Sequence, residues 1–327
     1  MNLDAVRVLA CIAVVGLHTM RCDVSAANSV LYYLCGFAVP VFFMSSGYIL
    51  MHREQITGTY ILRKLGSVML VVVLWNYLLY GAKAAALLVL GRADSIRITE
   101  LVLSPLMSLV KKGVLYHFWY LGALMLVYLL LYVIYRLHLN TRGWVLCLIV
   151  LGGSVTLQVI SYIHGAPLQK EVIQTFRLWT FMTYFLLGGV LAEKKEDVSR
   201  VPFWLHALLL LLFSVFIPVF QLLLPYGDRH AEYFYDDLFT LIWIGLLFTF
   251  VMRCSLTEGL KKVIGFVSPL TMGVYIVHIP LLSVVSHFVP EHSFVLSLAE
   301  WIGIFAVSLI VVYVLSKIPL VNKLIKL

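Results

Sequence analysis

Long apolar runs recur along this chain from end to end, separated by short stretches with charged residues, proline or glycine. A helix needs roughly 17–25 such residues to cross the hydrocarbon core of a bilayer. By this criterion the chain contains ten predicted spanning helices, at approximately 4–20, 29–51, 65–90, 115–135, 143–163, 177–192, 203–224, 236–252, 268–289 and 296–316. Hydrophobic residues make up 62% of the chain and charged residues 12%, whereas soluble domains have about 45–50% and 25%. The excess apolar surface predicts an all-α, polytopic membrane protein that contacts membrane lipids.

The apolar runs are not interrupted by a long polar block, and the stretch 91–114 is expected to be a loop. Residues 1–327 are therefore expected to form a single integral membrane domain with no appended soluble domain. The first run ends at His18 without the small-residue cleavage site of a signal peptide, so it is expected to remain as the first span. The five cysteines have neither metal-site nor paired spacing, which predicts unpaired thiols and no metal site.

Basic residues predict the orientation of the helices. If the N-terminus is inside, fourteen Lys and Arg residues fall in cytoplasmic segments and eight on the opposite side. Cytoplasmic loops of membrane proteins carry the excess of basic residues, so both termini are predicted to be cytoplasmic, in the cell (inner, cytoplasmic) membrane. The net charge of +8 is then mainly a consequence of topology, and no nucleic-acid partner is needed to explain it.

The first predicted span contains three ionisable residues, Asp4, Arg7 and His18. Arg7 and His18 are eleven residues apart, which on a helix places them about 20° apart on one face and about 16 Å apart along the axis. Ionisable groups inside a span are costly unless they face a polar cavity or a partner, so this stripe predicts a functional site. The alternative is that Arg7 extends to the lipid headgroups while His18 lies at the outer interface.

Two neighbouring segments add small and basic residues. The second span contains Pro40, Ser46 and Gly47, which permit close helix packing and, at Ser46, a cavity wall. The following loop carries Arg63 and Lys64. These basic residues either anchor the helix ends or bind the phosphates of an anionic donor.

Further candidate residues fall on the side opposite the predicted cytoplasmic face. His117 and Trp119 belong to an aromatic cluster at the start of the fourth span, where an interfacial belt is the alternative interpretation. In the ninth span, Tyr275 and His278 share a helix face beside a proline.

The loop 225–237 ends in Asp236 and Asp237 and combines acidic with aromatic residues. Carboxylates accept hydrogen bonds from hydroxyl groups and rings stack on sugar faces, so this composition suits a sugar-like acceptor. An ordinary solvated loop has the same composition.

Five segments, in this order, together resemble the acyltransferase-3 family of integral membrane acyltransferases. They are Arg7-x10-His18, Pro40-Val-Phe-Phe-Met-Ser-Ser-Gly47-Tyr48, His117-Phe-Trp119-Tyr-Leu, Tyr184-Phe-Leu-Leu-Gly188 and Ser268-x6-Tyr275-Ile-Val-His278. Family members often carry two spaced arginines after the second span, whereas here Arg63 is followed directly by Lys64.

The resemblance implies transfer of an acyl group, usually acetyl from acetyl-CoA, to a hydroxyl of a cell-surface or lipid-linked carbohydrate. It implies that His18 is the catalytic base and that Arg7 assists donor binding. We expect Arg63 and Lys64 to contact the CoA phosphates. The expected substrate cavity is lined by Ser46, His117, Trp119, Asp236, Asp237, Tyr275 and His278.

The rival hypothesis is a transporter of a small solute such as an amino acid. It rests on the relatives of this family that form the membrane portion of serine racemases. In that case the same polar stripe conducts a solute and no acyl donor is bound.

Overall fold

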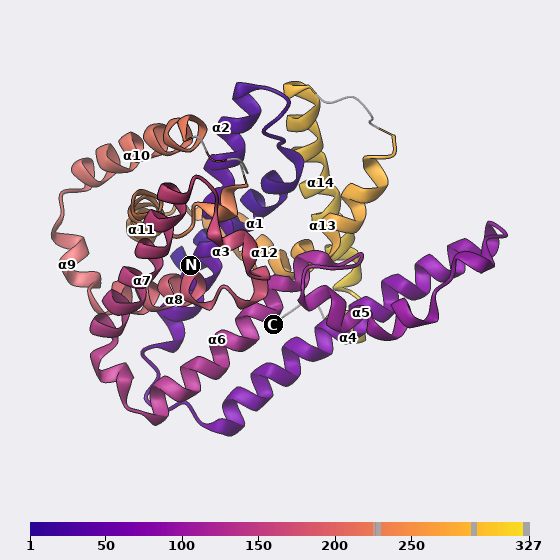
Figure 1. Ribbon diagram of the computed structural model, residues 1–327, viewed down its shortest axis with the longest axis horizontal. Coiled ribbons are helices and arrows are strands. Elements are labelled where there is room, and N and C mark those ends of the chain that lie inside the picture. Colours follow the sequence, from indigo (N-terminus) through magenta and orange to yellow (C-terminus); the bar gives the residue numbers. More distant parts are fainter. Residues whose placement is uncertain (225, 227–229, 289–292, 323–327) are drawn as a thin grey trace.

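The computed structural model describes residues 1–224, 226, 230–288 and 293–322, and its regular elements there are all helices (Figure 1). Eight of the described helical segments are long and apolar enough to cross a membrane, judged by length and composition. They are Asn2–Thr19, Ala26–Leu50, Gly58–Val89, Tyr116–Arg136, Leu139–His164, Phe203–Leu223, Glu258–Val285 and Phe294–Leu315. Two shorter apolar helices, Leu178–Glu193 and Leu238–Arg253, accompany them.

The individual elements are mostly α-helices joined by short 3-10 turns. In chain order they are α1 (Asn2–Thr19), α2 (Ala26–Leu34), η1 (Cys35–Phe37), α3 (Ala38–Leu50), α4 (Gly58–Val89), η2 (Ala93–Ser95), α5 (Ile98–Leu109), η3 (Tyr116–Phe118), α6 (Trp119–Arg136), η4 (Leu139–Arg142), α7 (Gly143–His164), η5 (Leu168–Glu171), η6 (Gln174–Phe176), α8 (Leu178–Glu193), α9 (Lys195–Arg200), α10 (Phe203–Leu223), η7 (Ala231–Tyr233), α11 (Leu238–Arg253), α12 (Glu258–Val267), η8 (Ser268–Leu270), α13 (Thr271–Val285), α14 (Phe294–Leu315) and α15 (Pro319–Asn322).

The predicted all-α class is confirmed, and the eight long and two shorter apolar helices are consistent with a polytopic membrane protein. The orientation of the termini stays a prediction. Two predicted spans begin too late. The helix predicted from residue 65 begins at Gly58, because the Thr57 hydroxyl accepts a hydrogen bond from the Tyr60 amide (3.2 Å) and so caps it. The helical run predicted from residue 268 begins at Glu258, because Pro269 falls in the first turn of η8, where proline is tolerated.

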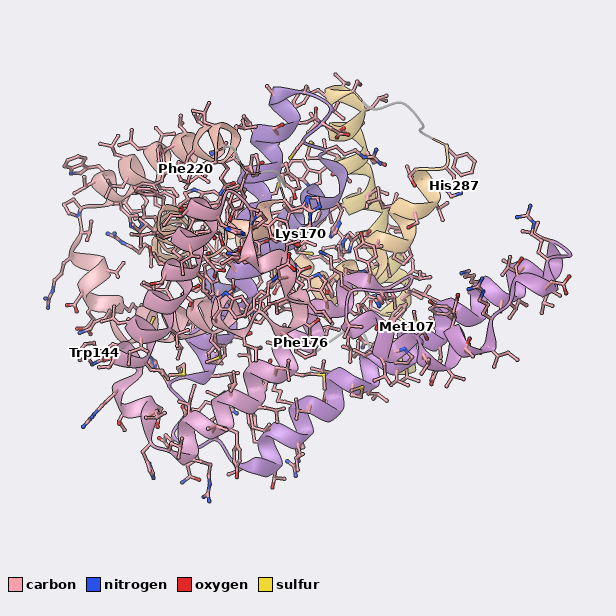
Figure 2. All side chains as sticks on the ribbon, in the orientation of Figure 1. Met107, Trp144, Lys170, Phe176, Phe220 and His287 are labelled. Carbon is pink, nitrogen blue, oxygen red and sulfur yellow. The ribbon has the colours of Figure 1, made fainter. Side chains whose placement is uncertain are left out.

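The prediction of a loop at 91–114 is wrong for α5. This helix has 12 residues, too few for the spanning criterion, but it packs against the second half of α4. At 32 residues, α4 is about 48 Å long and exceeds the hydrocarbon thickness. The buried Asn76 amide donates to the Ser108 hydroxyl (3.0 Å) and fixes the two helices together. The resulting hairpin extends away from the other helices (Figure 1), with Met107 near its base (Figure 2).

Among the described helices, α3 and α8 share the most extensive contact. A Cβ atom at Gly47 would overlap the backbone carbonyl of Phe185, and one at Gly188 would overlap that of Met44. Both glycines were part of the sequence segments singled out above. Their missing side chains allow backbone contact between these two helices, as small residues do in many membrane helix pairs.

The first helix lies in the middle of the bundle (Figure 1), where it packs against α3, α11, α12, α13 and α14. Ten of its eighteen residues are buried, among them Ala10, Cys11 and Val15. This position makes α1 a shared wall of the two largest apolar cores, and it places Arg7 and His18 inside the assembly of helices.

Candidate active site

One large pocket opens among the described residues at one end of α1. Its volume is about 810 Å³, and it lies between α1, α3, α4, α6, η8 and α13. The lining combines basic residues at one end with hydroxyl-bearing and apolar residues along the walls. The lining residues are Arg7, Phe42, Ser46, Tyr60, Arg63, Lys64, Ser67, Val68, Leu70, Val71, Tyr120, Leu121, Leu124, Tyr128, Ser268, Pro269, Thr271, Met272 and Tyr275.

Three basic residues, Arg7, Arg63 and Lys64, share this pocket, and none of its described lining residues is acidic. The Arg7 guanidinium lies 4.0 Å from an oxygen of Asp4, and its side chain is 34% exposed. That carboxylate is also held by the N-terminal amine (3.2 Å) and by the Ser268 hydroxyl (3.2 Å). The Asp4 carboxylate therefore interacts with both the N-terminal amine and Arg7 and does not neutralise Arg7 fully. The basic end of the pocket stays positive, which suits the binding of phosphates.

The walls of the pocket are rich in hydroxyl groups. Tyr60, Tyr120 and Tyr128 line it, and so does Ser46, whose hydroxyl donates to the Phe42 carbonyl (3.0 Å). The sequence did not assign these tyrosines to the site. Tyr60 was expected in the loop before the third span, and Tyr120 and Tyr128 lie in an apolar run, where the sequence does not distinguish a pocket wall from an interfacial belt.

Three histidines from different elements lie together beyond the pocket. The ring centroids of His18 and His278 are 5.3 Å apart, and those of His117 and His278 are 5.1 Å apart. They come from α1, η3 and α13, and His18 is not among the residues that line the pocket. The structure thus brings together the three histidines that the sequence singled out. Their catalytic or substrate-binding roles stay predictions.

A hydrogen bond fixes the orientation of the His278 ring, and a longer contact reaches the His18 ring. The His278 Nδ1 lies 2.7 Å from the Tyr275 carbonyl oxygen. A carbonyl only accepts, so Nδ1 carries the proton of the neutral ring and Nε2 keeps its lone pair. The Nδ1 of His18 lies 3.4 Å from the Tyr116 hydroxyl, which is a long contact. Tyr116 is a neighbour of His18 that the sequence interpretation did not assign to the site.

Tyr275 connects the histidines to the pocket. Its hydroxyl donates to the backbone carbonyl of His117. Its ring centroid lies 5.1 Å from that of His117 and 6.0 Å from that of His278. Because Tyr275 also lines the pocket, its side chain marks the boundary between the pocket and the histidines.

Trp119 is not among the residues that line the pocket. It is buried, and its ring packs against those of Phe181 (5.5 Å) and Tyr120 (6.4 Å), the second of which lines the pocket. Its assignment to a substrate cavity stays a prediction.

The predicted acceptor-side acids are held by protein partners. Asp236 is 1% exposed and accepts hydrogen bonds from four side chains. These donors are the Ser154 hydroxyl, the Gln169 amide, the Trp179 indole and the Thr180 hydroxyl.

Asp237 caps α11, because its carboxylate accepts from the amides of Phe239 (2.9 Å) and Thr240 (3.0 Å). Its other oxygen accepts from the Tyr162 hydroxyl (2.9 Å). Neither acid lines the described pocket. Their assignment to an acceptor-side cavity stays a prediction, although part of their loop, at 225 and 227–229, lies outside the described residues.

An ion-pair network around Glu232 was not expected from the sequence. Glu232 lies 3.0 Å from the Lys111 amine and 3.8 Å from the guanidinium of the buried Arg177, and it accepts a hydrogen bond from Gln174. These residues come from segments far apart in the chain, so no local pattern indicates their contact. In the described part of the chain, no group of three or more His, Cys, Asp or Glu residues is arranged to hold a metal ion.

A family model described as an acyltransferase domain, the acyltransferase-3 domain, matches residues 2–317. An amino-acid racemase from Enterococcus faecalis is 26% identical over 318 residues. That alignment covers 89% of this chain and 42% of the relative, so the chain spans less than half the length of the curated relative that it matches. No solved structure matches the chain.

Proposed function

Because this chain belongs to the acyltransferase-3 family, we propose that it is an O-acyltransferase of the cytoplasmic membrane. It transfers an acetyl group from acetyl-CoA to a hydroxyl of a cell-surface or lipid-linked carbohydrate. The observation that carries this proposal is the pocket of about 810 Å³, which is basic at one end and at the other reaches Tyr275, the side chain that contacts His117 and His278.

The basic end fits the donor. CoA carries several phosphate groups, and a planar guanidinium pairs with phosphate through two parallel hydrogen bonds. Arg7 therefore binds phosphate directly, and Arg63 and Lys64 add charge beside it. The tyrosines and apolar residues of the wall then enclose the uncharged arm of the donor, whose thioester points toward Tyr275.

His18 supplies the base. A neutral imidazole accepts the proton of the acceptor hydroxyl as that oxygen attacks the thioester carbon. A carbon–oxygen bond forms, the carbon–sulfur bond breaks, and the proton passes from the imidazolium to the departing thiolate, so the products are the ester and free CoA. Arg7 lies about 16 Å from His18 along α1, which limits it to donor binding.

Exchange of His18 for Ala tests the proposal. Purified protein is supplied with radiolabelled acetyl-CoA, and label on an acceptor, or release of free CoA, is measured. We expect H18A to lose both while its thermal unfolding is unchanged. The matched control is His287→Ala, two residues after the end of α13, whose side chain is exposed (Figure 2). Full activity of H18A contradicts the mechanism.

Transport of an amino acid is the second candidate, because the matched relative is named an amino-acid racemase. In this function the pocket, Tyr275 and the histidines form a solute path. Counterflow of labelled amino acids in proteoliposomes, with no dependence on acyl-CoA, favours transport. Acyl-CoA-dependent labelling without counterflow favours the transferase.

A further inference from the structure

Resting on the proposed function, we propose that the Tyr275 ring sets the length of the acyl group that this protein transfers. Tyr275 forms the end wall of the donor pocket directly in front of the histidines. A short acyl group brings its carbonyl level with His18 at this wall, whereas a longer acyl chain meets the ring.

The pocket ends one helical turn before the histidines on two separate helices. On α13, the last lining residue is Tyr275, and His278 follows three residues later. On α6, the first lining residue is Tyr120, and His117 precedes it by three residues, in the 3-10 turn η3. Three residues correspond to about 4.5 Å along an α-helix and about 6 Å along a 3-10 helix. On both segments, the pocket and the histidines are therefore separated by about one helical turn.

Tyr275 fills that boundary. Among the described residues that line the pocket, its ring is the one in contact with histidine rings, at 5.1 Å from His117 and 6.0 Å from His278. The side chain is 8% exposed, and its hydroxyl is anchored on the backbone carbonyl of His117. The end of the pocket that faces the histidines is therefore closed by this ring, and the space in front of the ring is what an acyl group has to fit.

Neighbouring rings hold Tyr275 in place. Tyr120 packs against it edge-on (5.7 Å) and Phe118 stacks on it (6.2 Å). Tyr120 is in turn packed against Phe42 and Phe43. Aromatic side chains have few rotatable bonds and lie here in a close-packed core, so the boundary cannot widen by small rotations. A misfit of one methylene group against such a wall reduces the rate by roughly 10-fold or more.

The test measures release of free CoA from acetyl-, butyryl- and hexanoyl-CoA by the purified full-length protein. Equilibrium binding of the same three donors is measured in parallel. Tyr275→Ala removes the wall, and we expect its preference for hexanoyl- over acetyl-CoA to rise about 10-fold or more relative to the unmodified protein. Tyr275→Phe keeps the ring and is expected to keep the original preference.

Met272→Ala is the matched control for pocket size. Met272 lines the pocket one turn before Tyr275 and enlarges it when truncated, but it has no ring contact with the histidines, so the acyl preference is expected to stay unchanged. If Tyr275→Ala does not fold, Tyr275→Leu removes the aromatic ring while keeping an apolar side chain, and the same shift is expected.

The outcomes separate this inference from the proposed function. Failure of all three donors to bind or react overturns both. Donor binding and turnover with an unchanged acyl preference in the variants that lack the ring overturn the inference alone. An equal shift in Tyr275→Phe also overturns it, because the hydroxyl and not the ring would then set the preference.

Discussion

The hydrogen bonds of Asp236 lead to a prediction that separates a structural role from an acceptor-binding role. In Asp236→Ala, the hydroxyls of Ser154 and Thr180 can rotate toward other acceptors, but the Trp179 indole N–H and one N–H of Gln169 lose their partner. An unsatisfied buried donor costs about 1–3 kcal/mol, so the free energy of unfolding should fall by about 2–6 kcal/mol.

Asp236→Asn should lower the free energy of unfolding much less than Asp236→Ala. The amide oxygen can replace the carboxylate oxygen that accepts from Gln169, Trp179 and Thr180, and the amide N–H then donates to the Ser154 hydroxyl. All neighbours keep a partner, and the buried charge is removed. We expect a loss of at most about 2 kcal/mol and retention of acyl transfer.

Thermal unfolding in detergent measures both variants. A thiol-reactive dye suits this assay, because Cys11, Cys35 and Cys147 are buried and become reactive as the helices separate. The unaltered protein and Asp236→Asn are also compared for acetyl transfer. If Asp236→Asn unfolds normally but has lost activity, Asp236 acts on the acceptor and the structural interpretation is refuted.

Three further predictions concern the packing and the site. Gly188→Ala should lower the free energy of unfolding by about 2 kcal/mol or more in the same thermal assay, because its Cβ would overlap the Met44 backbone. Gly245→Ala is the control and should leave that free energy unchanged, because no atom lies within 4 Å of the new Cβ. Tyr116→Phe should lower kcat about 2- to 10-fold without changing the KM for acetyl-CoA, because it removes a single long hydrogen bond to His18. A changed KM would contradict this role. Arg63→Ala should raise the KM for acetyl-CoA only about 2- to 5-fold, because an exposed ion pair between Arg63 and a donor phosphate contributes little. At high salt the KM of this variant should equal that of the unaltered protein.

The helices could be predicted largely from the sequence, because lipid demands long apolar segments and leaves a strong pattern. The predicted helix boundaries were wrong where hydrogen bonds or packing between helices, rather than hydrophobicity, determine the structure. The helix α5 is too short to span and forms because it packs on α4, through Asn76 and Ser108. The early start of α4 depends on a hydrogen bond that the Tyr60 amide donates to the capping hydroxyl of Thr57, just outside the apolar run.

The site could be predicted in part. Arg7 and His18 were singled out because ionisable groups inside spans are costly, and His278 because it shares a helix face with Tyr275 beside a proline. Neither argument depends on neighbours from other helices. The four donors around Asp236 lie 56 to 82 residues away in sequence, so a local pattern could not distinguish this buried network from a solvated acidic loop.

Binding of acetyl-CoA to two variants of α1 separates donor binding from proton transfer, the roles proposed here for Arg7 and His18. We predict that His18→Ala binds acetyl-CoA with the Kd of the unaltered protein but transfers no acetyl group. Arg7→Ala should weaken binding about 10-fold, the effect of losing a charge-assisted contact that is one-third exposed. Unchanged binding by Arg7→Ala, together with weakened binding by His18→Ala, would contradict this division of roles.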